Sequence, residues 1–300
     1  MRRLGAVLLL AGMAYAQPTV APTNEPTGIA RGENTPEYNV RQSFELGYRW
    51  RSVGGDLGAY RGMVNFGNGV RLLGSSLSVN SLEGLGHWFD QIQLNTQGLG
   101  SDPYQNALLR VEKNRLYRYD LGWRSTAYYN QFGQHSMDTV RNVQDHDVTF
   151  FPQSSLKFFL GFSRNTQRGP ALSTVQLFDS RGDEFPLFAD VRRQQHEYRA
   201  GFEVGMLGWR LNLLHGWANF REDTPTRVQG PSTGNNPADL STLTSFRRDE
   251  PYHGNSPYWR IALFKETRLW AFNGRFTYVS GRRSFVLDET AVGTDRFMPS

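Results

Sequence analysis

Charged side chains recur at every second position in several segments of this chain, with apolar side chains between them. In residues 116–124, Arg118, Asp120 and Arg124 alternate with tyrosine, leucine and tryptophan. Because successive side chains of a β-strand point to opposite faces, these charges share one face. Such a face can line a pore that favours anions, or its charges can neutralise one another as ion pairs. The candidate lumen-lining residues are Arg49, Arg51, Arg110, Arg118, Asp120, Arg124, Glu197, Arg199, Glu203, Arg210, Arg260 and Arg275.

The opposite face of the same segments is apolar, and it predicts contact with lipid. An apolar exterior around a charged interior inverts a water-soluble barrel and is typical of a transmembrane β-barrel. Aromatic residues near the expected strand ends suit interfacial girdles, because indole and phenol groups are apolar with one polar tip. The residues expected to contact lipid are Tyr119, Leu121, Phe158, Leu160, Phe202 and Phe272.

Catalytic motifs find little support in this sequence. None of the six histidines lies in a His-Glu-x-x-His zinc motif, and there is no Gly-x-Ser-x-Gly nucleophile elbow. His215 has the outward register of its strand, but its neighbours Gly216 and Trp217 offer no nucleophile. The chain has no cysteine, which excludes a disulfide framework and c-type haem attachment. We therefore expect a non-enzymatic protein with no cofactor and no metal.

The N-terminus has the pattern of a secretory signal peptide over residues 1–16. Arg2 and Arg3 precede the apolar run 4–13, and Ala14-Tyr15-Ala16 is a small-x-small cleavage site. The apolar run is about half the ~20 residues that a membrane-spanning helix needs. Residues 17–42 are polar and aperiodic and predict a flexible periplasmic tail. The net charge of +5 and the absence of a nucleic-acid motif argue against a nucleic-acid partner.

The remaining residues, 43–300, predict an all-β antiparallel transmembrane barrel of about eleven visible strands. Short turns alternate with long polar loops, and in bacterial barrels the former are periplasmic and the latter extracellular. Single-chain bacterial barrels normally have an even strand number, so we expect this chain to be part of a larger even-stranded barrel. The expected strands are 43–51, 70–81, 89–98, 106–112, 116–128, 146–151, 156–164, 191–204, 209–220, 258–264 and 268–281. The expected loops are 54–68, 129–145, 165–189, 221–257 and 282–300.

Several short segments resemble acidobacterial-type outer-membrane proteins related to the decahaem-cytochrome-associated (MtrB/PioB-like) porin family. They are Glu45–Arg49, Gly98–Tyr104, Tyr117–Leu121 and Gly161–Thr166. In that family a large barrel sheathes a periplasmic multihaem cytochrome, so the resemblance implies a wide lumen that holds a protein partner. The Cys-x-x-Cys pair near the start of some members is missing here.

The sequence thus predicts a porin-like barrel in the outer membrane, with outer-membrane lipid as its surroundings. It would provide passage for solutes or a sheath for a multihaem cytochrome that acts as an electron-transfer partner. The alternative is a soluble secreted β-rich protein that binds ligands or surfaces. The two differ in which face of the strands meets water.

Overall fold

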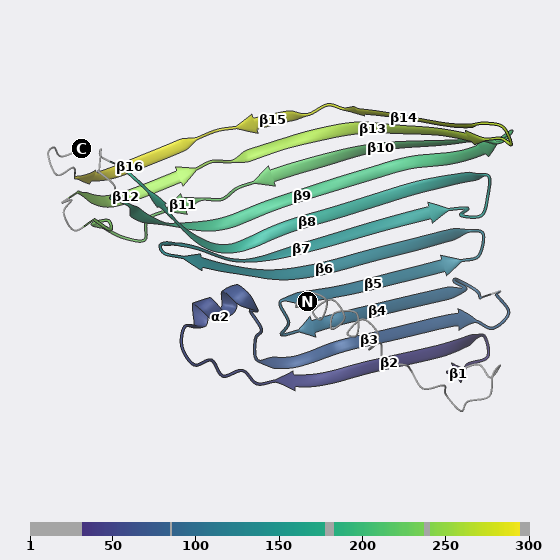
Figure 1. Ribbon diagram of the computed structural model, residues 1–300, viewed down its shortest axis with the longest axis horizontal. Helices are drawn as coiled ribbons and strands as arrows, with labels where there is room; N and C mark the ends of the chain where they lie inside the picture. The colour runs from purple at the N-terminus through teal and green to yellow at the C-terminus, as the bar shows by residue number, and fades with distance from the viewer. Residues whose placement is uncertain (1–31, 85, 178–182, 237–240, 295–300) are drawn as a thin grey trace, which may run out of the picture. The chain divides into compact units, whose positions relative to one another are not determined.

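The computed structural model describes residues 32–84, 86–177, 183–236 and 241–294. Within these residues the chain is all-β, with one large antiparallel sheet of sixteen strands and a short helix (Figure 1). The expected signal peptide, residues 1–16, and residues 17–31 of the expected tail lie outside the described part. Over the described residues, no helix has both the length and the apolar character needed to cross a membrane.

The strands follow one another in space nearly as they do along the chain. The sheet order is β1-β2-β3-β4-β5-β6-β7-β8-β9-β10-β13-β14, with β11, β12, β15 and β16 off this path. The elements are β1 (Glu33–Asn34), β2 (Tyr38–Arg49), α2 (Leu57–Met63), β3 (Gly69–Ser81), β4 (Gln91–Gly100), β5 (Tyr104–Lys113), β6 (Tyr117–Phe132), β7 (His135–Phe150), β8 (Leu156–Val175), β9 (Phe185–Met206), β10 (Trp209–Glu222), β11 (Thr226–Arg227), β12 (Thr242–Asp249), β13 (Tyr252–Glu266), β14 (Ala271–Val279), β15 (Arg282–Phe285) and β16 (Asp288–Thr294).

Several short strands continue longer ones. β11 follows β10 and pairs with β9, and β12 leads into β13. β14 and β15 both pair with β13, and β16 pairs with β12. The three composite traverses are therefore β10–β11, β12–β13 and β14–β16. The eight strands β2–β9 and these three composite traverses make eleven traverses of the sheet. Every step from β2 to β14 is antiparallel and β14 is the tenth strand after β2, so these two strands run in the same direction. Antiparallel closure between them is therefore impossible.

The long loops expected from the sequence are mostly strand, and these expectations are wrong. The expected loop 129–145 is a hairpin whose strands β6 and β7 are separated only by Gly133 and Gln134. Likewise β8 and β9 extend through much of 165–189, β10 to β13 occupy much of 221–257, and β15 and β16 lie within 282–300. The strand β2 also begins inside the expected tail 17–42. These extensions lack the regular alternation of apolar and polar residues that identifies a half-buried strand in sequence.

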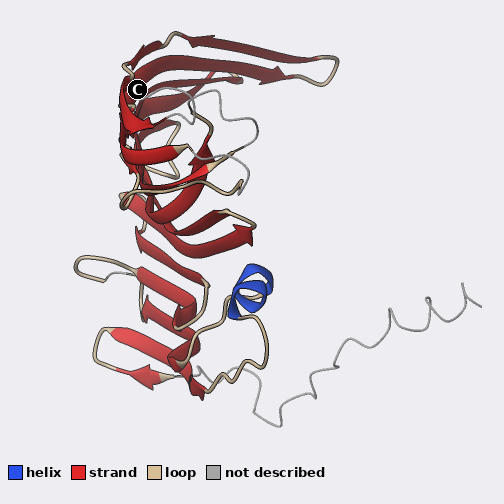
Figure 2. Cartoon of the chain, turned by 90° about the vertical axis from the view of Figure 1, so that its left-hand side faces the viewer, coloured by secondary structure: helices blue, strands red, loops and turns tan. Residues whose placement is uncertain are grey.

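The expected loop 54–68 contains the helix α2. The Asp56 side chain caps it by accepting hydrogen bonds from the backbone N–H groups of Gly58 at 2.6 Å and Ala59 at 3.3 Å. Arg61 of α2 forms an ion pair of 2.8 Å with Asp138 of β7, and its guanidinium lies 4.0 Å from the ring centre of Tyr129 in β6. These contacts hold α2 against the ends of β6 and β7 that meet at Gly133 and Gln134, to one side of the sheet in Figure 2. We call this end of the sheet the loop side, and we call the end with the short turns, such as that between β9 and β10, the turn side.

The register divides the side chains of the sheet between two faces. Directly opposite residues point to the same side, so the pairs Leu121–His146, His146–Phe162 and Phe162–Tyr198 belong to one face. We call this the apolar face, and we call the face that carries Arg118, Asp120 and the residues opposite them the polar face. The six residues expected to contact lipid all lie on the apolar face: Tyr119, Leu121, Phe158, Leu160, Phe202 and Phe272.

Buried hydrophobic side chains are few and gather at the loop end. The core consists of Phe185 and Leu187 of β9 with Leu243 and Phe246 of β12, each between 0 and 4% exposed. Partly buried hydrophobic residues of the β8 end and of the loop after β11 pack against it. We call this part the cored extension: the loop-side ends of β8 and β9 together with β11, β12 and β16. Elsewhere the sheet is largely a single layer (Figure 2).

Candidate functional site: the polar face of the sheet

The register places the expected lumen-lining residues together on the polar face. Asp120 is opposite Arg110 and Asp147, Glu203 is opposite Lys157 and Asn212, and the others follow the same alternation. Arg51 is the exception because it lies just beyond the end of β2. It donates a hydrogen bond of 3.0 Å to the backbone oxygen of Phe66. Those on the polar face are Arg49, Arg110, Arg118, Asp120, Arg124, Glu197, Arg199, Glu203, Arg210, Arg260 and Arg275.

Most arginines of this face have an acidic partner. Asp120 of β6 accepts from the Nε of Arg110 at 2.6 Å and lies 3.1 Å from the Nε of Arg118. Glu203 of β9 accepts from the Nζ of Lys157 at 2.8 Å, with the Nε of Arg210 at 3.9 Å. These pairs favour the ion-paired interpretation of the charged face over a face of unopposed positive charge.

A longer connection crosses β7, β8 and β9. The Nη2 of Arg199 in β9 donates to Asp147 of β7 at 3.0 Å, so its side chain spans the strand between them. The residue in its path on β8 is Gly161, where an added Cβ would lie 2.6 Å from the Arg199 Nε. The missing side chain of Gly161 therefore makes room for the arginine to lie flat across the sheet.

The same arrangement of a long side chain over a glycine recurs two strands further on, at β10. The Tyr258 hydroxyl of β13 donates to Glu197 of β9 at 2.5 Å, and the ring crosses β10 at Gly216. A Cβ on Gly216 would lie 2.3 Å from a ring carbon of Tyr258. Since Glu197 is also 3.7 Å from Arg199, the chain of polar contacts runs from β7 to β13. It holds four neighbouring strand pairs in register by their side chains.

The remaining polar-face arginines are less constrained. Arg124 is 3.9 Å from Asp145, which also accepts a hydrogen bond of 2.5 Å from Ser163. The guanidinium of Arg260 lies 4.8 Å from the ring centre of Tyr258. Arg275, on β14, is exposed. Among the expected lumen-lining arginines on this face, Arg260 and Arg275 are the ones without a carboxylate partner in the described part of the chain.

A separate cluster closes the loop-side ends of β2, β3 and β4. Asp102 accepts a hydrogen bond of 2.6 Å from Arg49 and another from Arg71. Burial alone would raise the pKa of Asp102, but the hydrogen bonds and positive charges of Arg71 and Arg49 outweigh it and lower that pKa below its ordinary value of 3.8. The guanidinium of Arg49 also stacks on Phe66 at 3.9 Å. This cluster fixes the approach of the connection that carries α2.

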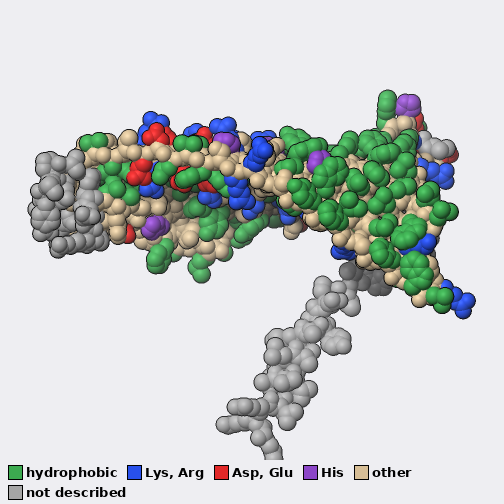
Figure 3. Space-filling view, turned by 90° about the horizontal axis from the view of Figure 1, so that it is seen from above, with side chains coloured by type: hydrophobic (Ala, Val, Ile, Leu, Met, Phe, Trp, Pro, Cys, Tyr) green, Lys and Arg blue, Asp and Glu red, His purple; other side chains and the backbone are tan. Residues whose placement is uncertain are grey.

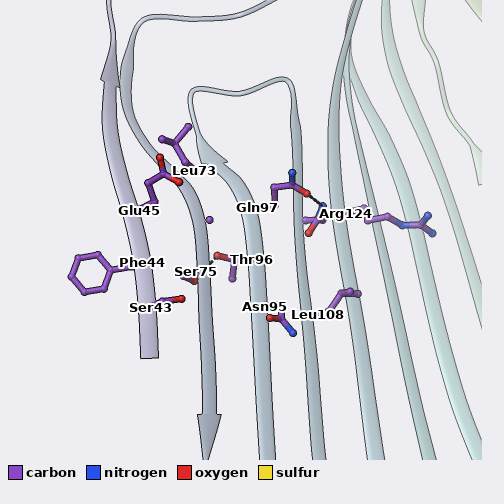
Figure 4. A pocket seen from close by; sticks show the side chains of 12 residues that line it. Ser43, Phe44, Glu45, Leu73, Ser75, Asn95, Thr96, Gln97, Leu108 and Arg124 are labelled. Atoms are coloured by element: carbon purple, nitrogen blue, oxygen red, sulfur yellow. Dashed lines mark hydrogen bonds between the residues drawn. The ribbon is translucent and has the colours of Figure 1, made fainter. Parts of the chain in front are cut away.

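A large hollow lies on the polar face between β2 and β6, with a volume of about 820 Å³. Its walls include Glu45, Asn95, Gln97 and Arg124, whereas Phe44 points away from it (Figure 4). The side-chain amide of Asn106 donates to Gln97 at 3.4 Å at its edge. Amide and carboxylate groups around an open hollow suit a hydrated polar solute.

Several residues of this face escaped the sequence analysis. Asp145 was missed because it lies in the expected loop 129–145. Asp147 lies in the expected strand 146–151, but its role depends on Arg199, two strands away. Lys157, Tyr258 and Asp102 were missed because their importance depends on which residue lies opposite. Gly161 and Gly216 carry no signal in a single sequence, since their role is the space that they leave.

No group of histidine, cysteine and acidic residues that could hold a metal ion occurs among the described residues. Compared with family models, curated proteins and solved structures, the chain finds no match. Its function must therefore be argued from the two faces of the sheet.

Proposed function

We propose that this chain forms the wall of a porin-like β-barrel in the outer membrane, with the apolar face toward lipid and the polar face toward a water-filled passage. The observation that carries the proposal is a sharp boundary on the apolar face. On one side of it lie Phe162, Tyr198 and Trp217, and the next residues of that face on the same strands are Arg164, His196 and Asn219. A boundary at the same level in neighbouring strands matches the edge of a hydrocarbon layer.

The apolar band has the height that a membrane requires. Along β10 it runs from Trp209 to Trp217, and at about 3.3 Å per residue this is roughly 26 Å along the strand. The apolar band of outer-membrane barrels is about 25 Å tall, and strand tilt shortens the projected length somewhat. Figure 3 shows hydrophobic side chains gathered toward the turn end of the sheet and most charged ones toward the other end.

Aromatic residues mark both limits of this band. At the turn side, the rings of Trp209 and Trp270 lie 6.4 Å apart, and the Lys265 ammonium sits 4.8 Å from the Trp209 ring centre. At the loop side, His215 stacks on Trp259 with ring centres 3.9 Å apart. Along β10, the residues of this face between the two limits are Leu211 and Leu213. Aromatic residues at both limits of an apolar band are typical of an outer-membrane barrel.

Exposure of the band argues against the soluble alternative. Leu160 is 52% exposed, Phe276 57% and Tyr278 55%, although all are large and apolar. Soluble monomers rarely expose contiguous apolar patches beyond a few hundred Å². A soluble sheet would cover this face with a second layer, but the only hydrophobic core among the described residues is that of the cored extension.

The paired charges of the polar face suit a hydrated passage. An ion-paired lining gives many hydrogen-bonding groups with little net field, so it favours polar solutes over a single sign of charge. Because β2 and β14 run in the same direction, ring closure needs a parallel pair or a further strand between them. The use of the lumen as a sheath for a multihaem cytochrome is the second form of this proposal, and it rests on the resemblance given above.

The test is reconstitution of the purified full chain into lipid vesicles loaded with a small fluorescent dye. We expect the chain to float with the vesicles on a density gradient, to need detergent for solubility without them, and to release the dye. A chain that stays monodisperse in buffer and does not float would establish the soluble alternative. Flotation without dye release would contradict an open passage and leave the sheath form.

A further inference from the structure

Beyond the passage, we infer that the outward face carries a binding site for the phosphorylated headgroup of an outer-leaflet lipid, made by Arg168 of β8, Arg192 of β9 and Arg221 of β10. The inference deepens the proposed function and rests on it, because it takes the apolar face to be the lipid side. All three residues continue the register of that face past the polar boundary. They meet around a hollow of about 150 Å³ whose other walls include Gln194 and Asp223.

The first argument is an unfavourable pair. Arg168 and Arg192 are directly opposite each other on adjacent strands of one face, where Cβ atoms are about 5 Å apart and like charges repel. Arg168 has no carboxylate within ion-pair distance in the described part of the chain, and both side chains are exposed. An anion bound between the two guanidinium groups would relieve this repulsion.

The second argument is the local balance of charge. Asp190 lies 2.5 Å from the Nη2 of Arg192, and Asp223 lies 3.4 Å from Arg221. Arg164, on the same face and nearer the boundary, has no such partner among the described residues and is exposed. Four arginines thus face two aspartates on this patch, so it keeps an excess of positive charge. The planar guanidinium group of arginine can donate two parallel hydrogen bonds to the oxygens of one phosphate group.

The third argument is position. Arg221 follows Trp217 by four residues and Arg168 follows Phe162 by six, which is roughly 13–20 Å along the strand and less along the membrane normal because strands tilt. Arginine side chains also reach back toward the membrane surface. The patch therefore lies beyond the loop-side aromatic limit of the band, on the side where headgroup phosphates are expected and within reach of them for long side chains. A solute in the lumen would meet the other face.

The experiment measures binding of a lipopolysaccharide with a phosphorylated inner core to the detergent-solubilised full chain. The test variant carries Arg168→Gln, Arg192→Gln and Arg221→Gln together. The matched control is Arg141→Gln, an exposed arginine in the loop-side half of β7 on the polar face, opposite Gln167. Two further measurements use the same lipopolysaccharide after enzymatic dephosphorylation, and the phosphorylated lipid in the presence of excess inorganic phosphate. Circular dichroism and electrophoretic mobility before and after heating confirm that the variants fold.

We expect the triple variant to bind the phosphorylated lipid at least roughly tenfold more weakly, because it loses charge-assisted hydrogen bonds to phosphate. The Arg141→Gln variant should bind like the parent, dephosphorylated lipid should bind weakly to both, and inorganic phosphate should not displace the lipid. Unchanged binding by the triple variant, or equal binding of dephosphorylated lipid, would overturn the inference. Displacement by inorganic phosphate would assign the site to a free anion instead. A chain that fails to float with vesicles contradicts the proposed function, whereas one that floats without arginine-dependent binding contradicts only this site.

Discussion

The cored extension and the apolar band differ in whether protein covers their large apolar side chains. In the extension, Phe185 and Leu243 are fully buried against each other's strands, as apolar residues are in water-soluble domains. In the band, Leu160 and Phe276 keep about half of their surface exposed, with no protein layer over them in the described part of the chain. One chain thus carries a water-type core and an uncovered apolar face. Under the proposed function, this difference means that the solvent changes along the strands.

The largest effect should come from the extension. Leu243→Ala leaves a cavity in a packed core and should cost about 2–5 kcal/mol of unfolding free energy. The matched change in the band, Leu160→Ala, should cost far less, because lipid tails can fill the space. Denaturant unfolding of both variants in the same lipid checks this difference. Equal losses would mean that Leu160 is packed against protein and that the two regions do not differ.

An arginine placed in the band should be nearly as costly. Leu213 of β10 lies on the apolar face, opposite Phe202 and Ile261, and Leu213→Arg should cost about 2–4 kcal/mol. Its neighbour Asn212 lies on the polar face opposite Glu203, so Asn212→Arg should be tolerated. Folding yield and resistance to heat in detergent separate the two variants. If Asn212→Arg lowers the folding yield and heat resistance more than Leu213→Arg does, the assignment of the two faces is reversed.

A glycine of the polar face gives a smaller test of the side-chain network. Gly216→Ala would place a methyl group against the Tyr258 ring and break its hydrogen bond to Glu197, at about 1–3 kcal/mol. Gly122→Ala on the same face meets its nearest neighbour, Leu108, only at 3.8 Å and should be close to neutral. Unfolding measurements on both variants decide whether the network is tight. Similar stability of the two would show that Tyr258 is free to move.

The smallest expected effect is a pH dependence at the loop-side ends of β2 to β4. The folded-state pKa of Asp102 is lowered, so its charged form stabilises the fold above about pH 4, and this contribution is lost as pH falls through the folded value. Asp102→Asn should therefore destabilise the chain by roughly 1 kcal/mol at neutral pH. The two proteins should converge in stability at lower pH. A difference that persists unchanged into strong acid would assign the effect to packing.

The alternation of the faces was predictable from sequence, and the partners across the sheet were not. In β6 and β8 the period-two pattern alone places Leu121, Phe158 and Leu160 on one face. By contrast, the contact of Arg199 with Asp147 depends on the register of three strands and on the space above Gly161. A single sequence specifies neither. The loop-side extensions were not predicted because their apolar and polar residues do not alternate regularly, as in Phe185–Phe188, where both faces are apolar.

The most direct test of the central claim is the solvent that each face of β8 meets. The chain has no cysteine, so single cysteines can be introduced one at a time from Leu156 to Arg168 and spin-labelled after reconstitution in lipid vesicles. Collision rates with oxygen, which concentrates in lipid, and with a water-soluble nickel complex report the surroundings of each label. We predict that oxygen collisions alternate with period two, are high at Phe158, Leu160 and Phe162, and fall away from Arg164 onward. Labels that are equally accessible to the nickel complex on both faces would contradict the assignment of this sheet to a membrane.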